Sequence, residues 1–278
     1  MSLSIVTPSL DMLPFLKCCA ASVSDQEGVR AEHIVIDGGS RDGTADWLAA
    51  QTGIGWISEK DRGMYDAVNK GLRLAGGELL AYLNCDEQYL PGTLAFAREF
   101  FANNPGTDIL FGDFLVTRPD GSLVAYRKSF APKPLYIYAS FLYTYTCTMF
   151  LRRRIIDDGF WFDPRLRVAG DAEWLLRVLR AGYVARHVRR YLSVFIDSGA
   201  NASRGKAALA AARREFRPGM PAWLQAGRWL VNGVRLLEKA WRGNYRQGAL
   251  EYDMYAVGGP GRRSHFAPRK ATFRWRNG

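Results

Sequence analysis

The chain is poor in cysteine and has no apolar run long enough to cross a membrane. Its four cysteines, Cys18, Cys19, Cys85 and Cys147, form neither a C-x-x-C pair nor the spacing of a zinc site. This usage argues against a disulfide framework or a structural zinc centre and is typical of a reducing compartment. No N-terminal signal peptide is visible, because the first apolar residues already form a strand-like pattern. We expect a cytoplasmic protein, and a position at the inner face of the cell membrane stays open.

Nucleic-acid-binding motifs are also missing, although the net charge is +11. The sequence has no helix-turn-helix, zinc-finger or RNP-like pattern, so we expect no nucleic-acid partner. Residues 222–243 instead form a basic amphipathic pattern with three tryptophans. Such a helix suits an anionic membrane interface, and packing against the rest of the protein is an equal alternative.

Short apolar strands alternate with helical patterns in the first third of the chain. Leu3–Pro8, His33–Asp37 and Leu79–Leu83 are the predicted strands, and Asp11 and Thr44 are predicted to cap helices between them. Strands that alternate with helices predict a parallel sheet covered on both faces. The fold class is therefore α/β.

Three polar turns follow these strands. Thr7–Ser9, Asp37–Ser40 and Asn84–Glu87 should converge, because ligands bind beyond the carboxyl ends of strands in open parallel sheets. The acidic turn offers oxygen ligands to Mg²⁺ or Mn²⁺, which commonly complete their coordination with substrate phosphates and water. Two alternatives remain: the acidic pair simply opens a turn, and Asp37 simply holds an Asx-turn.

Three ordered motifs, Ile36–Thr44, Ser58–Gly71 and Leu83–Glu87, resemble the signatures of family 2 glycosyltransferases of the GT-A fold. The resemblance is to bacterial enzymes of exopolysaccharide, colanic-acid-type and O-antigen assembly, and it covers about the first two hundred residues. It implies a mostly parallel nucleotide-binding sheet flanked by helices. It also implies a catalytic domain over residues 1–200, with a nucleotide-sugar half (1–112) and an acceptor half (113–200), followed by a basic, partly amphipathic helical extension (201–278).

The resemblance also implies roles for individual residues. The predicted nucleotide-sugar contacts are Thr7, Pro8, Ser9, Asp37, Asp61, Arg62, Asn69, Lys70, Asn84, Cys85 and Asp86. Asp86 would hold Mn²⁺ or Mg²⁺, with Glu87 beside it. The chain departs from the family at Gly38, where a second acid is common, and at Asn84, where the D-x-D motif usually begins with aspartate. A surface ion pair between Asp66 and Lys70 is the alternative to a ligand role for Lys70.

Residues 162–179 look like the second acidic motif of the family, a loop that enters a helix, and Asp171 matches its catalytic base. An acceptor hydroxyl is a poor nucleophile until a carboxylate takes its proton. One base opposite the leaving nucleotide gives a single displacement with inversion. The alternatives are that Asp171 only caps the helix, or that Glu173 is the base. His187 and Arg190 are candidate phosphate contacts, with a structural role as the alternative for His187.

These patterns favour an inverting, metal-dependent glycosyltransferase. It would move a sugar from a nucleotide-sugar, by default a UDP-sugar, to a hydroxyl of a glycan or a polyprenyl-diphosphate-linked acceptor. A GT-A-like scaffold of a polysaccharide assembly complex is the alternative from another class. A nucleotidyltransferase is a more distant one, which release of pyrophosphate would reveal.

Overall fold

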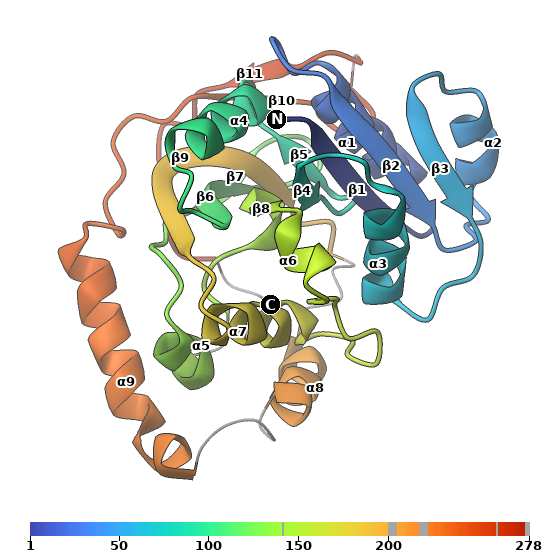
Figure 1. The fold of residues 1–278 in the computed structure, drawn as a ribbon. Coiled ribbons are helices and arrows are strands. Elements are labelled where there is room, and N and C mark those ends of the chain that lie inside the picture. The colour runs from blue at the N-terminus through green and yellow to red at the C-terminus, as the bar shows by residue number, and fades with distance from the viewer. Residues whose placement is uncertain (141, 200–204, 217–221, 260, 276–278) are drawn as a thin grey trace.

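The computed structural model describes residues 1–140, 142–199, 205–216, 222–259 and 261–275. Its centre is a nine-stranded sheet (Figure 1). The strands are β1 (Leu3–Ser9), β2 (Ala31–Asp37), β3 (Ile54–Ser58), β4 (Leu79–Tyr82), β5 (Glu87–Tyr89), β6 (Ile109–Thr117), β7 (Leu123–Arg127), β8 (Phe150–Arg152) and β9 (Ala185–Ile196). Their order across the sheet is β3-β2-β1-β4-β8-β6-β9-β5, and β7 pairs with β6 at the side.

The first four strands of this order are all parallel. β1 pairs with β2 and β4, and β2 pairs with β3, each in the parallel sense. Beyond β4 the sheet is mixed: β8 is antiparallel to both of its neighbours, whereas β6 and β9 are parallel. The α/β class and the parallel nucleotide-binding half predicted from the sequence are therefore confirmed.

Helices cover both faces of the sheet (Figure 1). They are α1 (Leu13–Ser24), α2 (Thr44–Ala49), α3 (Met64–Leu74), α4 (Thr93–Asn103), α5 (Pro134–Ser140), α6 (Arg154–Asp157), α7 (Gly170–Arg180), α8 (Gly205–Phe216) and α9 (Ala222–Trp241), with a 3-10 turn at Thr146–Thr148. Side chains alternate along β1, so Leu3 and Ile5 pack in the core layer of α1 and α4. Val6 packs in the opposite layer, with α3 and α7.

Two predicted helix caps are wrong. Asp11 lies before α1 with a positive φ of 50°, and its carboxylate accepts a hydrogen bond from the Arg41 N–H (2.7 Å). The helix itself begins at Leu13 without a side-chain cap. Thr44 is the first residue of α2, and the cap position belongs to Gly43 in a left-handed conformation. Asp11 joins the loop after β1 to the loop after β2, whereas the Thr44 hydroxyl donates to Asp42 (2.6 Å) within its own loop.

Among the described residues beyond 201, the helices are α8 and α9. Residues 244–259 and 261–275 return to the sheet and include a hairpin of β10 (Tyr252–Met254) and β11 (Ser264–Phe266). Phe266 fills the space above Gly121, where a Cβ would lie 2.1 Å from its ring. Trp275 packs against Phe195 of β9 at 5.3 Å between ring centroids.

In the described part of the chain, no helix combines the length and the apolar character that crossing a bilayer requires. All four cysteines are free and buried.

Candidate active site

The carboxyl ends of the parallel strands meet at one edge of the sheet. Ser9, Asp37 and Ser58 lie side by side in register at the ends of β1, β2 and β3. The Gly38 N–H donates to the Ser9 carbonyl at 2.9 Å, which ties the first two turns together. β4 ends at Tyr82, and residues 83–86 continue from it beside the end of β1. The predicted convergence of the three polar turns is therefore confirmed.

Asp37 is fully buried at the end of β2. Its carboxylate accepts hydrogen bonds from the Ser40 N–H (3.1 Å), the Ser40 hydroxyl and the Ser58 hydroxyl (2.6 Å). The Asx-turn alternative thus describes a contact that is present, and the same carboxylate links the β2 turn to the end of β3. Its contact with a nucleotide base stays a prediction.

Gly38 is explained by Asp61. A Cβ on Gly38 would lie 2.8 Å from Oδ2 of Asp61, and the other oxygen of Asp61 accepts the Gly63 N–H at 2.8 Å. A second acid at position 38 would meet this carboxylate at contact distance and repel it. A carboxylate from the loop before α3 therefore already lies beside position 38.

The remaining residues of the first turn differ in their orientation. The Thr7 hydroxyl is buried and hydrogen-bonds to Nε2 of His33 at 2.9 Å, so its side chain serves the sheet and does not reach a ligand. Pro8 is buried next to it, and the Ser9 hydroxyl lies beside the Cys85 thiol. Burial raises the pKa of Cys85 to about 12, which keeps this thiol neutral.

Asn84 and Glu87 are joined to each other by hydrogen bonds across the acidic turn. The Glu87 carboxylate is buried and accepts hydrogen bonds from the Asn84 N–H (2.8 Å) and the Asn84 side-chain amide (3.2 Å). The Glu87 N–H donates back to the Asn84 carbonyl at 2.9 Å. Aspartate at position 84 would set two carboxylates against each other, so Glu87 explains why this chain has asparagine there.

The acidic turn suits a divalent metal that takes one protein carboxylate. The prediction that Glu87 is a ligand is not supported, because its oxygens face Asn84. Asp86 is half-buried at the tip, and the side-chain oxygen of Asn84 is buried without a protein hydrogen-bond partner. Within the described ranges, no cluster of three or more His, Cys, Asp or Glu side chains is arranged to hold a metal. A hard cation at Asp86 would need the oxygens of a bound diphosphate and water to complete its shell.

Three of the predicted nucleotide-sugar contacts, all between residues 59 and 71, have partners within the protein. Asn69 is buried and its amide exchanges two hydrogen bonds with the backbone of Phe162 (2.8 and 3.1 Å), so the ligand role predicted for it is replaced by a structural one. Lys70 pairs with Glu59 at 2.7 Å, and Arg62 pairs with Asp66 at 2.9 Å. The Arg62 side chain is 76% exposed, which leaves it accessible to an anionic ligand.

Asp171 lies in the first turn of α7 and meets α3. The Tyr65 hydroxyl donates a hydrogen bond to its carboxylate and accepts one from the Asp171 N–H (3.1 Å). The helix cap is Ala169, so Asp171 is not the N-cap that the alternative interpretation required. Burial raises the pKa of Asp171, and the hydrogen bond from Tyr65 opposes this shift. The carboxylate is thus a stronger base than an exposed aspartate.

A stack of aromatic rings supports this carboxylate. The Phe162 ring lies between Tyr65 (5.7 Å) and Trp174 (4.7 Å), stacked on both. A Cβ on Gly170 would lie 2.4 Å from the Tyr65 ring, so only glycine lets the tyrosine approach Asp171. The sequence motifs assigned no site role to Tyr65, which lies among buried residues of α3. The sequence feature that could have indicated a site role is the Tyr65 hydroxyl, which lies two residues after Gly63 at the start of a helix that faces the site.

Other candidate residues lie elsewhere or have partners. Glu173 pairs with Arg177 at 2.6 Å, which leaves Asp171 as the base candidate of this motif. His187 is buried in the sheet opposite Asp113 at 3.2 Å, and the Arg190 guanidinium lies over the Phe96 ring at 4.5 Å. Neither contact places these two side chains at the strand ends, so the structure contradicts the phosphate role considered for them.

Glu215 of α8 anchors the loop that precedes Asp171. Its carboxylate accepts hydrogen bonds from the N–H groups of Arg167 (3.0 Å), Val168 (3.0 Å) and Ala169 (2.8 Å). The Arg167 guanidinium in turn lies against Gly63, 2.5 Å from the position of a Cβ there. A residue from the predicted extension therefore orders the catalytic loop, a role that no local pattern around Glu215 indicated.

The sequence model described as "Glycosyl transferase family 2" matches residues 4–168, more than half of the chain. The chain belongs to glycosyl transferase family 2. Asp171 lies three residues beyond the matched range, whereas the predicted nucleotide-sugar contacts lie within it.

Curated relatives support the membership in this family. A PGL/p-HBAD biosynthesis glycosyltransferase of Mycobacterium bovis is 34% identical over 119 residues, 41% of this chain and 46% of the relative. Glycosyltransferase AglE of Haloferax volcanii is 26% identical over 194 residues, 65% of this chain and 62% of the relative. The chain thus spans about half the length of the mycobacterial relative it matches.

Solved structures show the same GT-A fold. S. aureus TarS 1–349 in complex with UDP-GlcNAc superposes with a TM-score of 0.62 at 15% identity, covering 86% of this chain and 72% of TarS 1–349. The mannosyltransferase PcManGT of Pyrobaculum calidifontis, in complex with GDP-Man and Mn²⁺, gives a TM-score of 0.57 at 18% identity, with 88% and 76% covered. The resemblance to family 2 stated from the motifs is therefore confirmed.

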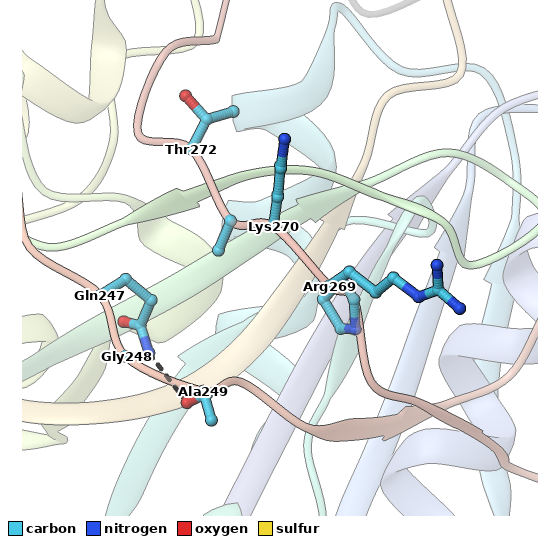
Figure 2. A pocket seen from close by; sticks show the side chains of 8 residues that line it. Gln247, Gly248, Ala249, Arg269, Lys270 and Thr272 are labelled. Carbon is cyan, nitrogen blue, oxygen red and sulfur yellow. Dashed lines mark hydrogen bonds between the residues drawn. The ribbon is translucent and has the colours of Figure 1, made fainter.

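One hollow of about 560 Å³ lies away from this family 2 site. It is lined by residues 247–249 and 268–272, none of which is a candidate site residue. Figure 2 shows the side chains of Arg269 and Lys270 pointing in different directions, so the two cations do not converge on one ligand. The strand-end site remains the candidate site of this family 2 protein.

We expect Glu215→Gln to loosen the catalytic loop, because a neutral amide oxygen accepts less strongly than a carboxylate. The expected loss is about 1–3 kcal/mol of unfolding free energy. Amide hydrogen exchange of residues 165–172 should become faster, measured by mass spectrometry. Glu99→Gln, the same change at an exposed position of α4, is the control. Unchanged exchange in the loop would show that Glu215 does not order it.

Proposed function

We propose that this protein transfers a sugar from a nucleotide-sugar to an acceptor hydroxyl with inversion at the anomeric carbon. The observation that carries the proposal is the partly buried Asp171 carboxylate, held by Tyr65 at the point where α7 meets the start of α3. Because α3 follows the loop of Asp61, this base lies next to the edge where the polar turns converge. The membership in glycosyl transferase family 2 supports the same chemistry.

The donor would lie across the strand ends. Asp37 and Asp61 offer carboxylates for the base and sugar, and Arg62 offers an exposed guanidinium for phosphate. UDP is the default carrier. A structure of TarS holds UDP-GlcNAc and one of PcManGT holds GDP-Man, so a nucleotide-sugar fits proteins of this fold.

Mn²⁺ or Mg²⁺ would be held by Asp86, with Asn84 beside it. When bound, the metal supplies positive charge to the departing diphosphate. The protein residues do the rest: Tyr65 orients Asp171, and Asp171 takes the proton of the acceptor hydroxyl. The acceptor oxygen bonds to the anomeric carbon as the bond from that carbon to the phosphate oxygen breaks, and a nucleoside diphosphate leaves.

The acceptor would bind in the half formed by residues 113–200, which contributes α7 and β9. We propose a glycan or a polyprenyl-diphosphate-linked sugar of bacterial surface polysaccharide synthesis, in the cytoplasm. Residues 1–200 would form the catalytic domain and 201–278 an extension that stabilises it through Glu215.

The decisive experiment is a thermal-shift screen against UDP-, GDP- and dTDP-sugars, each with and without Mn²⁺, because a ligand that binds the folded state raises its stability. Donors that bind are then incubated with lipid-linked acceptors, and the product is analysed by mass spectrometry. One stabilising donor class and release of a nucleoside diphosphate support the proposal. Release of pyrophosphate would indicate a nucleotidyltransferase, and the absence of any donor shift would favour the scaffold.

We expect Tyr65→Phe to move the acid limb of the kcat/KM profile to higher pH. The tyrosine hydroxyl stabilises ionised Asp171, so its removal raises the pKa of a carboxyl that burial already raises. The base is then protonated over a wider range, and activity falls first at the acid end. A pH–rate series on both proteins measures this shift. An unchanged acid limb would mean that Tyr65 does not act on the base.

A further inference from the structure

Helix α9 turns its apolar face away from the protein. Five side chains lie within about 80° of one another on an ideal helix and are between 55% and 85% exposed. This apolar stripe consists of Trp223, Leu230, Val234, Leu237 and Trp241. It extends over 19 positions of the helix, about 27 Å at 1.5 Å per residue. Figure 1 shows α9 at the left edge of the molecule, outside the layers that cover the sheet.

A polar face of α9 next to the apolar stripe holds the helix on the protein. Glu238 accepts hydrogen bonds from Lys133 (2.8 Å), Tyr136 (2.7 Å) and Arg242 (2.8 Å). Burial would raise the pKa of Glu238, but these hydrogen bonds outweigh it and lower the pKa to about 2. The anchor is therefore ionised throughout the physiological pH range.

Cations on the same inward face stack on aromatic rings of the body. Arg235 lies over Tyr143 at 5.6 Å, and Arg242 lies over Phe130 at 5.3 Å. Because the helix is held by polar contacts, its orientation is specified, and rotation of the apolar stripe toward the core would break them. Of the two alternatives from the sequence, packing against the protein is therefore observed, and the apolar stripe stays exposed.

The segment of the chain that contains α9 is rich in cations. Residues 201–250 contain ten lysines and arginines and two acids, a net charge of +8. Of the two acids, Glu215 binds the loop before Asp171 and Glu238 is 14% exposed and paired. Arg228 and Arg246 are exposed. A segment with this net charge repels a second copy of itself and is attracted to an anionic surface.

We propose that α9 binds the interface of an anionic lipid bilayer, parallel to the membrane plane, with the apolar stripe inserted among the lipids. Tryptophans at both ends suit the boundary between headgroups and acyl chains. Exposed leucine, valine and tryptophan side chains gain free energy when they leave water, and the flanking cations reach lipid phosphates. This proposal goes beyond sugar transfer and does not require it.

The contact would orient the acceptor half toward the membrane. α9 packs on α5, and α5 packs on α7, the helix of Asp171. A short, continuous set of helices therefore joins the lipid-binding face to the base.

Flotation of the full chain with vesicles tests the proposal. Vesicles of phosphatidylcholine are compared with vesicles of equal parts phosphatidylcholine and phosphatidylglycerol. We expect binding to the anionic vesicles, weaker binding at high salt, and a blue shift of tryptophan fluorescence. Leu237→Ser combined with Trp241→Ser should reduce binding by roughly tenfold or more, given the transfer free energy of each side chain.

The matched control is Leu74→Ser on α3, where an apolar side chain that is 51% exposed lies outside the stripe. It should bind vesicles like the unmodified protein, and circular dichroism should confirm that all variants fold. Equal binding by the double variant would overturn the proposal. Binding to neither vesicle would also overturn it, as would a dimer in light scattering that the double variant dissociates, which would assign the stripe to a second copy. Donor thermal shifts on the same proteins report the sugar-transfer site separately.

Discussion

Asp171→Asn should lower the transfer rate by about 10²–10⁴-fold, the usual contribution of a general base. The amide keeps the shape of the side chain and can still accept the hydrogen bond from Tyr65, but it cannot take a proton. We expect the loss in kcat, with the thermal shift by the donor unchanged, because the base acts on the acceptor. Steady-state kinetics with a saturating donor measure the effect.

Glu173→Gln is the matched control, two residues after Asp171 on α7. Its carboxylate pairs with Arg177 on a partly exposed surface, and an ion pair of this kind is worth about 0.3–0.5 kcal/mol. Its transfer rate should stay close to that of the unmodified protein. If Glu173→Gln abolished transfer while Asp171→Asn did not, the assignment of the base would be wrong.

Asp86→Ala should remove the metal dependence of donor binding. Asp86 is the carboxylate at the tip of the acidic turn, since the oxygens of Glu87 are bonded to Asn84. Without it, we expect the affinity for Mn²⁺ with donor to fall by about a hundredfold or more, because a ligating carboxylate should matter at least as much as the groups that support it. Isothermal titration of donor with and without Mn²⁺ measures this loss.

The turn itself should survive the substitution, because its backbone contacts remain. The Asp86 carbonyl accepts a hydrogen bond from the Ile196 N–H at 3.0 Å. The hydrogen bonds between Asn84 and Glu87 do not involve the Asp86 side chain. Asp120→Ala, in an exposed hairpin turn, serves as the control for loss of one carboxylate. Donor binding that responds to Mn²⁺ equally in Asp86→Ala would contradict the metal site.

The sequence predicted strands of the parallel half of the fold because each of these strands can be recognised from its own residues. β1, β2 and β4 are short apolar runs closed by turns, and each needs only its own pattern to be recognised. The family motifs also assigned the acidic turn and Asp171 to one predicted site. The mixed half was less visible, since β8 and β5 have only three residues each and depend on distant partners.

Side-chain roles that depend on distant residues were the hardest to predict. Asn69 and Thr7 lie in motifs that suggest ligand contacts, yet Phe162 and His33 take their hydrogen bonds. Gly38 and Asn84 looked like weakened motif positions, and each turned out to accommodate a nearby carboxylate. Position in a motif does not show which neighbour occupies a polar atom; only the assembled fold does.

The hydrogen bond from Ile196 to Asp86 links the two halves of the chain at the metal turn. β5 follows that turn at once and pairs only with β9, whose partner residues Ser193–Phe195 are made more than a hundred residues later. A ribosome that has finished residues 1–112 has therefore produced every predicted donor ligand but not β9, the strand that contacts the acidic turn. Donor and acceptor halves of this protein should not be exchangeable as separate modules in chimeras with its relatives, because each new pairing would have to rebuild that shared strand contact.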